Sequence, residues 1–315
     1  MTARAFITGI GGQDGTYLAE RLLADGLEVH ALVLAADGHP AHCPEAVVLH
    51  RGDLADVDGT RRLLLEVAPS EVYNLAAISS VAQSWDEPDL TARVNGQAAV
   101  ALMESARQVG GVRFVQASSA EIFGEPAESP QTEATAVRPV NPYGAAKAYA
   151  HLTAGVLRQR DEHVSSVVLY NHESPRRPAR FVTRKITSTV AAIARGDADR
   201  LALGNLEARR DWGWAPDYVD AMVRAARAEV PGDYVVATGV AHSVRELVAA
   251  AFSAAGIDDW EPLVHQDPAF FRPADPTELV GDATRAREVL GWEPTVGFEE
   301  IVRRMVEADL TLPAG

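Results

Sequence analysis

The chain has 315 residues, of which 47% are hydrophobic and 23% charged, and its formal net charge is −15. This balance is typical of a soluble globular protein with one large α/β domain or two smaller ones, and the negative charge argues against a nucleic-acid partner. The single cysteine, Cys43, excludes an internal disulfide, and the sequence has neither zinc-type Cys/His spacing nor an apolar run long enough for a membrane helix. The N-terminus passes directly into a predicted strand without signal-peptide features, so we expect a cytoplasmic protein without a membrane segment or a metal.

A glycine-rich turn opens the chain. A short apolar run at residues 5–8 leads into GIGGQDG, where Gly9, Gly12 and Gly15 follow a GxxGxxG spacing, and leucines then recur at helical spacing. A strand, a glycine turn and a helix in this order bring the backbone close to a pyrophosphate and point helix N-terminal amides at it. Because strands and helices keep alternating afterwards, the turn predicts a dinucleotide-binding domain.

The second predicted strand, at residues 28–34, ends without a side chain that would select between NAD and NADP. An acidic side chain there would bind the ribose 2′-hydroxyl and an arginine would bind a 2′-phosphate. Leu34 and Ala35 stand in these places instead. Asp37 comes late and could equally be a solvated turn residue, so these residues leave the phosphate state of the cofactor open.

Further strands are predicted at residues 46–50, 71–75 and 113–117. Asp53, after the first of them, could accept a hydrogen bond from the adenine amine or cap the next helix. The small Ala76 and Ala77, after the second, would let a flat cofactor lie close. Residues 90–109 have the periodicity of a long amphipathic helix, which could form a dimer face or simply pack on the core.

Four side chains with complementary chemistry follow the last of these strands. Ser119 and Glu121 lie two residues apart, and Tyr143 and Lys147 lie four apart on a helix predicted over residues 142–158. Residues four apart share a helix face, so the ammonium group can lie near the phenol, lower its pKa and favour the phenolate. Such a pair can remove the proton of a sugar hydroxyl while a hydride leaves the same carbon.

The second half of the chain contains clusters of arginine. A strand at residues 165–170 is followed by a basic run, which suits a diphosphate but could also be a solvated cationic face. The run comprises Arg176, Arg177, Arg180, Arg184 and Lys185, and a second basic pair, Arg209 and Arg210, comes later. We predict an α/β protein with a Rossmann-type, doubly wound parallel sheet over residues 1–168, a return segment near residues 217–238, and a smaller substrate domain over residues 169–315.

These motifs resemble those of the extended short-chain dehydrogenases/reductases that act on nucleotide sugars and, within that group, the GDP-mannose 4,6-dehydratase family. The carrying motifs span nearly the whole chain: TGIGGQDGTYLAE, VYNLAA, SSAEIFG, NPYGAAKAYA, YNHESPRR, FVTRKI, LGNLEARRDWGWAPDYVDAM, ATGVAHSVRE and FRPADPTELVGD. NHESPRR, FVTRKI and RRDWG together are the most specific, because generic epimerases of this superfamily do not carry them.

The resemblance implies a lyase, an NDP-hexose 4,6-dehydratase that acts on GDP-mannose. Tyr143, helped by Lys147 and Ser119, would take the C4 hydroxyl proton as the C4 hydride leaves. Glu121 would then remove the C5 proton and help expel the C6 hydroxyl as water, before the hydride returns to C6. The alternatives are a 4-epimerase or 4-ketoreductase on the same scaffold, which would not need Glu121, and a non-catalytic NAD(P)-sensing protein.

The resemblance also implies which residues contact the ligands. Cofactor contacts fall on Gly9, Gly12, Gln13, Asp14, Gly15, Asp53, Leu54, Leu75, Ala76, Ala77, Ser79, Tyr143, Lys147, His172 and Arg177. Contacts with the nucleotide and diphosphate of the substrate fall on Asn171, Lys185, Arg210 and Arg272.

Two departures from the family pattern bear on the cofactor and on the assembly. The family pattern implies NADP as the cofactor. NAD stays possible, because Leu34 and Ala35 replace the usual arginine pair. The loop from Asp37 to Ala46 is much shorter than the family loop that reaches a neighbouring subunit in the tetramer. We therefore expect a homodimer that forms through the long helices. A related NDP-hexose stays an open alternative to GDP-mannose.

Overall fold

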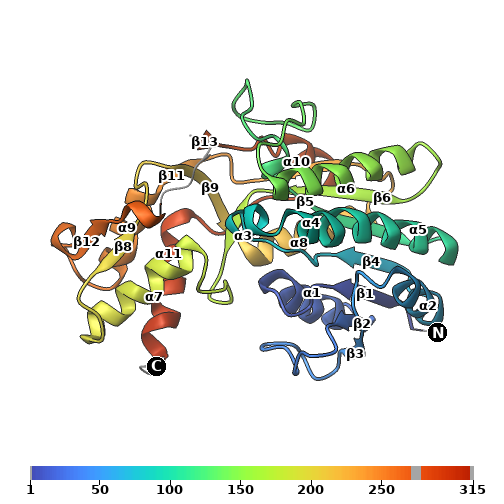
Figure 1. Ribbon diagram of the computed structural model, residues 1–315, viewed down its shortest axis with the longest axis horizontal. Helices are drawn as coiled ribbons and strands as arrows, with labels where there is room; N and C mark the ends of the chain where they lie inside the picture. The colour runs from blue at the N-terminus through green and yellow to red at the C-terminus, as the bar shows by residue number, and fades with distance from the viewer. Residues whose placement is uncertain (1, 271–277, 313–315) are drawn as a thin grey trace.

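A parallel sheet of seven strands forms the centre of the larger of two lobes (Figure 1). The computed structural model describes residues 2–270 and 278–312. The strand order is β10-β6-β5-β4-β1-β2-β3, and all neighbours pair in parallel. The strands are β1 (Arg4–Thr8), β2 (Glu28–Val33), β3 (Val48–Arg51), β4 (Glu71–Asn74), β5 (Arg113–Ser119), β6 (Val164–Leu169) and β10 (Asp233–Val236). This order is that of a doubly wound dinucleotide-binding fold with one added strand, which confirms the predicted fold class.

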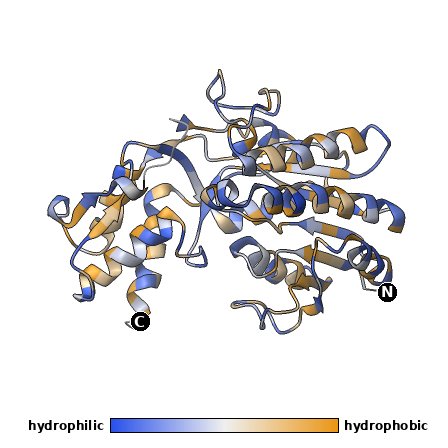
Figure 2. Cartoon of the chain, viewed as in Figure 1, coloured by the Kyte–Doolittle hydropathy of each residue, from blue (hydrophilic) through white to orange (hydrophobic). Residues whose placement is uncertain are grey.

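Helices cover both faces of this sheet and bury one apolar cluster on each. They are α1 (Gln13–Ala24), α2 (Val57–Val67), α3 (Val81–Asp86), α4 (Pro88–Thr91), α5 (Ala99–Val109), α6 (Pro142–Arg158), α8 (Ala215–Arg227) and α10 (Thr284–Leu290). On one face α1 packs against α8, with Leu18 and Met222 fully buried. On the other face α2, α5 and α6 bury Leu64, Leu102 and Ala154. The helices of both lobes show mixed hydrophobic and hydrophilic colouring in Figure 2, as expected for helices that bury one side.

The helix predicted over residues 90–109 is not a single regular helix. A π-helical segment, η1 (Ala92–Ala98), separates α4 from α5. Asn95 in this segment is buried, and its Oδ1 accepts from the backbone N–H of Ile78 at 2.8 Å while its Nδ2 donates to the Ile78 carbonyl at 3.0 Å. The irregular turn therefore ties the helix to the loop that follows β4.

The smaller lobe forms from the second half of the chain. Its helices α7 (Val182–Arg195), α9 (Val244–Ala254) and α11 (Phe298–Thr311) pack together around a third apolar cluster. Its strands are β7 (Asn171–Glu173), β8 (Leu201–Leu203), β9 (Arg209–Trp214), β11 (Ala241–Ser243), β12 (Val264–Gln266) and β13 (Glu278–Leu279), and it has short 3₁₀ turns at η3 (Glu261–Leu263) and η4 (Pro268–Phe270). A further 3₁₀ turn, η2 (Ala120–Ile122), follows β5 in the larger lobe. Because β7 follows β6 directly and pairs with β9, the chain enters this lobe at the carboxyl edge of the large sheet.

The described part of the chain offers neither a membrane span nor a metal cluster. Within residues 2–270 and 278–312, none of the helices combines the length and the apolar character that crossing a membrane requires. Over the same described ranges, no group of three or more His, Cys, Asp or Glu side chains is arranged to hold a metal ion.

Candidate active site

A pocket of about 290 Å³ opens at the carboxyl edge of the large sheet, between the two lobes. Parallel strands end at one edge, so the loops after β4, β5 and β6 meet there, as in other doubly wound folds. The lining residues are Asp14, Leu75, Ala77, Ser79, Ser80, Val81, Ala82, Ala117, Ser118, Ser119, Ala120, Glu121, Tyr143, Lys147, Leu169, Tyr170, Asn171, His172, Arg177, Arg180, Phe181 and Arg210. The structure therefore brings together all four predicted catalytic side chains.

The glycine turn has the shape that a dinucleotide requires. Gly9 has a φ of 80°, and a Cβ on it would lie 2.7 Å from the backbone nitrogen of Ala76, so a side chain would not fit. Gly12 is the N-cap of α1 and supplies no side-chain cap, so the first amides of this helix keep their capacity to bind an anion. The turn and Gly15 at the helix start fit the pyrophosphate of a dinucleotide.

The side chains after the glycine turn join the two lobes. Gln13 donates to the His172 carbonyl at 3.1 Å and accepts from the Ser174 hydroxyl at 2.8 Å. Asp14 and His172 form a partly buried pair with Oδ2 and Nε2 2.9 Å apart. Burial alone would lower the pKa of His172, but the Asp14 carboxylate raises it above its usual value. These contacts hold the start of α1 against the strand that follows β6.

Tyr143 lies in the first turn of α6, is partly buried and lines the pocket. Burial raises the pKa of Tyr143 to about 12, and a hydrogen bond with the Ser119 hydroxyl offsets only part of this. The predicted lowering of this pKa by Lys147 is thus wrong for the protein alone. The Lys147 ammonium lies 5.9 Å from the phenol ring centroid and donates instead to the Ala117 carbonyl at 2.9 Å.

Lys147 is the most deeply placed cation of the site. It is 3% exposed, and burial lowers its pKa to about 8, with the Asp14 carboxylate acting in the opposite direction. The Ala117 carbonyl that it contacts also accepts from the Gln116 side chain at 2.9 Å. Lys147 can therefore exchange its proton near neutral pH, unlike an exposed lysine.

Glu121 faces the pocket from the 3₁₀ turn after β5. Its Oε2 accepts a hydrogen bond from Nδ2 of Asn141 at 2.8 Å, and its backbone N–H donates to the Ser119 hydroxyl at 3.3 Å. The carboxylate and the phenol thus share one pocket, although Glu121 lies in the 3₁₀ turn after β5 and Tyr143 lies at the start of α6.

The pocket is more cationic than the chain as a whole. Its lining includes four cationic side chains and two carboxylates. The cations are Lys147, Arg177, Arg180 and Arg210, and the carboxylates are Asp14 and Glu121. In a chain with a net charge of −15, this local excess suits an anionic ligand such as a diphosphate. The Arg177 guanidinium also lies 3.8 Å from the ring centroid of Phe181, which restricts its position.

Several predicted contact residues lie outside the lining of this pocket. Leu54 is buried, and the Asp53 carboxylate accepts from the backbone of Ala55 at 2.9 Å, whereas Asp56 caps α2. Lys185 lies on α7 with its ammonium 3.4 Å from the ring centroid of Phe270. Of the remaining predicted contacts, Gly9, Gly12, Gln13 and Gly15 belong to the glycine turn and the start of α1, and Ala76 follows β4 and lies beside Gly9. Arg272 lies outside the described residues.

Sequence reasoning missed some residues that the structure places at the pocket. Ser118 lines the pocket and is 3% exposed, and its buried hydroxyl has no hydrogen-bond partner among the described residues. Tyr170 and Phe181 also line the pocket. The two serines at the end of β5 were a usable signal for Ser118. An aromatic residue such as Phe181 carried no such signal.

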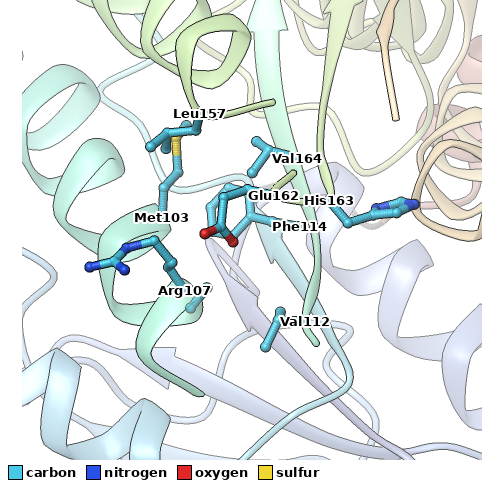
Figure 3. Close-up of a pocket in the computed structure, with 9 residues that line it drawn as sticks. Met103, Arg107, Val112, Phe114, Leu157, Glu162, His163 and Val164 are labelled. Atoms are coloured by element: carbon cyan, nitrogen blue, oxygen red, sulfur yellow. The ribbon is translucent and has the colours of Figure 1, made fainter. Parts of the chain in front are cut away.

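A second hollow lies at the opposite end of β5 (Figure 3). Met103, Val112 and Phe114 form apolar walls, and Arg107 and Glu162 bring charges to it. The enclosed space is about 10 Å³, room for about one water molecule. Its size and its place at the amino edge of the strands exclude it as the site for a nucleotide sugar.

Comparison with known proteins identifies the family. The sequence profile described as GDP-mannose 4,6 dehydratase matches residues 6–305. The chain belongs to the GDP-mannose 4,6-dehydratase family. It is 43% identical to GDP-mannose 4,6 dehydratase 1 of Arabidopsis thaliana, covering 98% of this chain and 90% of that protein. It is 41% identical to GDP-mannose 4,6 dehydratase of Homo sapiens, covering 98% and 91%.

Solved structures of nucleotide-sugar enzymes share the fold. UDP-glucose 4-epimerase of Thermus thermophilus, in complex with NAD, superposes with a TM-score of 0.87 at 31% identity and covers 97% of this chain and 98% of that one. Membership of the GDP-mannose 4,6-dehydratase family confirms the resemblance found in the sequence motifs, because the profile match extends across both lobes.

Replacement of Lys147 tests the state of this buried lysine. Its pKa falls from 10.5 to about 8 on folding, so between these values the unfolded chain holds a proton that the folded chain has lost, and stability rises with pH. Lys147→Met removes the cost of burying the charged ammonium. Below pH 8 we therefore expect the unfolding free energy of the variant to exceed that of the wild type by up to about 3 kcal/mol. Urea unfolding at neutral pH and near pH 10 measures the difference, which should shrink as the pH rises. A difference between the variant and the wild type that does not change with pH would contradict the assignment.

Proposed function

We propose that the protein is an NDP-hexose 4,6-dehydratase that converts GDP-mannose to GDP-4-keto-6-deoxymannose. The observation that carries this proposal is the position of Glu121 in the same pocket as Ser119, Tyr143 and Lys147. The last three suffice to oxidise a hydroxyl, but a 4-epimerase or 4-ketoreductase never breaks the C5–H bond and needs no carboxylate for it. The dehydratase names of the relatives support the same conclusion.

Tyr143 is proposed to take the proton of the C4 hydroxyl, with Ser119 as its hydrogen-bond partner. The oxidised nicotinamide, when bound, supplies the hydride acceptor and a positive charge that favours the phenolate. Lys147 supplies a second positive charge from the same helix face. The proton passes between Tyr143 and the C4 hydroxyl of the substrate.

Glu121 is proposed to act on C5 after C4 becomes a ketone. The ketone acidifies the C5 proton, which the carboxylate removes and then delivers to the departing C6 oxygen. Arg177, Arg180 and Arg210 line the pocket and are suited to the diphosphate of the substrate. Asn171 lies beside them, and we propose that Lys185 and Arg272 contribute to binding of the nucleotide.

NADP is the proposed cofactor, and Arg51 supports this choice. Arg51 ends β3 opposite Val33, and its exposed guanidinium donates to the backbone carbonyls of Leu34, at 3.4 Å, and Asp37. These carbonyls belong to the loop in which the family carries its arginine pair. A guanidinium at this loop is placed to bind a ribose 2′-phosphate.

We propose that the larger lobe binds the cofactor and the smaller lobe binds the substrate. Residues 1–168 would hold the cofactor, with residues 217–238 returning to the same lobe, where β10 pairs with β6 and α8 packs on α1. Residues 169–315 would bind the nucleotide sugar. The pocket that receives residues from both lobes supports this division.

A homodimer is the proposed assembly, formed through α6. Tyr149, Leu152 and Val156 are 52%, 54% and 59% exposed and follow each other at helical spacing on its outer face. Exposed apolar residues grouped in this way are typical of a protein interface. A second copy of the chain would cover this stripe with its own α6, since a twofold interface joins identical surfaces.

Glu121→Gln tests the reaction. Incubation of the wild type with GDP-mannose should give a product lighter by one water, read by mass spectrometry. The variant should lose this activity by roughly 10²–10⁴-fold, because the base is gone, while it still oxidises C4 and accumulates reduced nicotinamide. Glu125→Gln, an exposed position nearby, should behave as the wild type. Normal dehydration by Glu121→Gln would show that another group is the base.

Arg51→Leu tests the cofactor. We expect the affinity for NADP to fall about 10- to 100-fold, the usual effect of removing a hydrogen bond to a charged group, while that for NAD stays unchanged. Isothermal titration of the cofactor-free protein with each dinucleotide measures both affinities. Arg62→Leu, an exposed arginine on α2, is the matched control. Equal losses for both dinucleotides, or none, would rule out this role for Arg51.

Leu152→Arg tests the assembly. A charge in the middle of the stripe should convert the dimer to a monomer, because it cannot be desolvated against its own copy. Size-exclusion chromatography with light scattering gives the mass of each species. Val289→Arg, at an apolar residue of α10 that is 54% exposed, should leave the dimer intact. A tetrameric wild type would contradict the proposal.

A further inference from the structure

Asn141 connects the start of α6 to the Glu121 carboxylate. The residue is 5% exposed and is the N-cap of the helix. Its Oδ1 accepts from the backbone N–H of Gly144 at 2.7 Å, and its Nδ2 donates to Oε2 of Glu121 at 2.8 Å. One side chain thus begins the helix that carries Tyr143 and holds the second reacting group of the site.

The chemistry of its two partners fixes the orientation of the Asn141 amide. A backbone N–H can only donate, so the amide oxygen must face Gly144 and the NH₂ group must face the carboxylate. Serine and aspartate cap helices as well as asparagine does, but a cap needs only an acceptor. Asparagine is the capping residue that also presents an amide donor to Glu121.

The first turn of α6 also packs against the backbone of Glu121. A Cβ on Gly144 would lie 2.5 Å from the Glu121 carbonyl oxygen, so the residue must be glycine for this close approach. The backbone N–H of Tyr143 donates to the buried Ser84 hydroxyl at 3.2 Å. The position of Tyr143 relative to Glu121 is therefore set by this one turn of helix.

We propose that Asn141 is a positioning residue for the elimination step, an inference that rests on the proposed role of Glu121. By holding Oε2, it leaves the other carboxylate oxygen, Oε1, to take the C5 proton. In that step the C5–H bond breaks, and its electron pair forms the C5–C6 double bond. The C6–O bond breaks at the same time, and the proton leaves Glu121 with the C6 oxygen as water.

Asn141→Ser and Asn141→Asp test this role, because both keep a helix cap and remove the amide donor. Each variant is incubated with GDP-mannose, while water loss is followed by mass spectrometry and reduced nicotinamide by its absorbance. We expect dehydration to slow about 10- to 100-fold, as for loss of a hydrogen bond to a charged group, with KM unchanged. Reduced nicotinamide should accumulate, since Tyr143 still permits C4 oxidation. A purely structural role would slow oxidation and dehydration together.

Two controls keep the outcomes separate. Ser243→Ala removes the cap of α9, which is distant in sequence from the site, so it should lower thermal stability without accumulation of reduced nicotinamide. Wild-type dehydration by folded Asn141→Ser or Asn141→Asp, without accumulation, overturns the inference. Glu121→Gln run in parallel shows which idea has failed. If Glu121→Gln also dehydrates the substrate normally, then Glu121 is not the base. If Glu121→Gln is blocked while the Asn141 variants are not, then only the proposed role of Asn141 is wrong.

Discussion

Parallel pairing of the large sheet is the constraint on which the site depends. The neighbours from β3 to β10 all run in the same direction, so the loops after β1, β4, β5 and β6 end at one edge. A glycine turn, a pair of small residues, a Ser/Glu motif and the entry to the smaller lobe therefore meet, although they are far apart in the sequence. The pocket forms at this edge because each of these loops supplies residues with a different chemistry to it.

A buried polar network holds this edge together. The Thr8 hydroxyl donates to Asn74 at 2.6 Å, the Asn74 amide donates to Gln116 at 2.8 Å, and Gln116 donates to the Ala117 carbonyl that also receives Lys147. Thr8, Asn74 and Gln116 are each 1% exposed. A buried network in which each amide finds partners favours one arrangement over its alternatives. The glycine turn and Lys147 are thus linked through four elements of the fold.

Local signals predicted some elements closely and failed at others for physical reasons. The helix over residues 142–158 begins and ends as predicted, because Asn141, a proline and the apolar spacing all mark the same start. The helix over residues 90–109 contains a π segment, which accompanies the tertiary hydrogen bonds of Asn95. The pKa of Tyr143 moves opposite to the prediction, because burial outweighs a neighbouring charge and burial is not visible in residue spacing.

The sequence by itself determined the parallel fold and the glycine turn, and it singled out the four side chains that are proposed to react, since these depend on local spacing and residue chemistry. Only the tertiary structure decided which arginines of the basic run face the pocket. Arg177 and Arg180 line it, whereas Arg176 pairs with Glu20 and Arg184 with the buried Asp309. The reason is that these carboxylates come from α1 and α11, far away in the chain, and a cation's partner depends on which elements pack beside it.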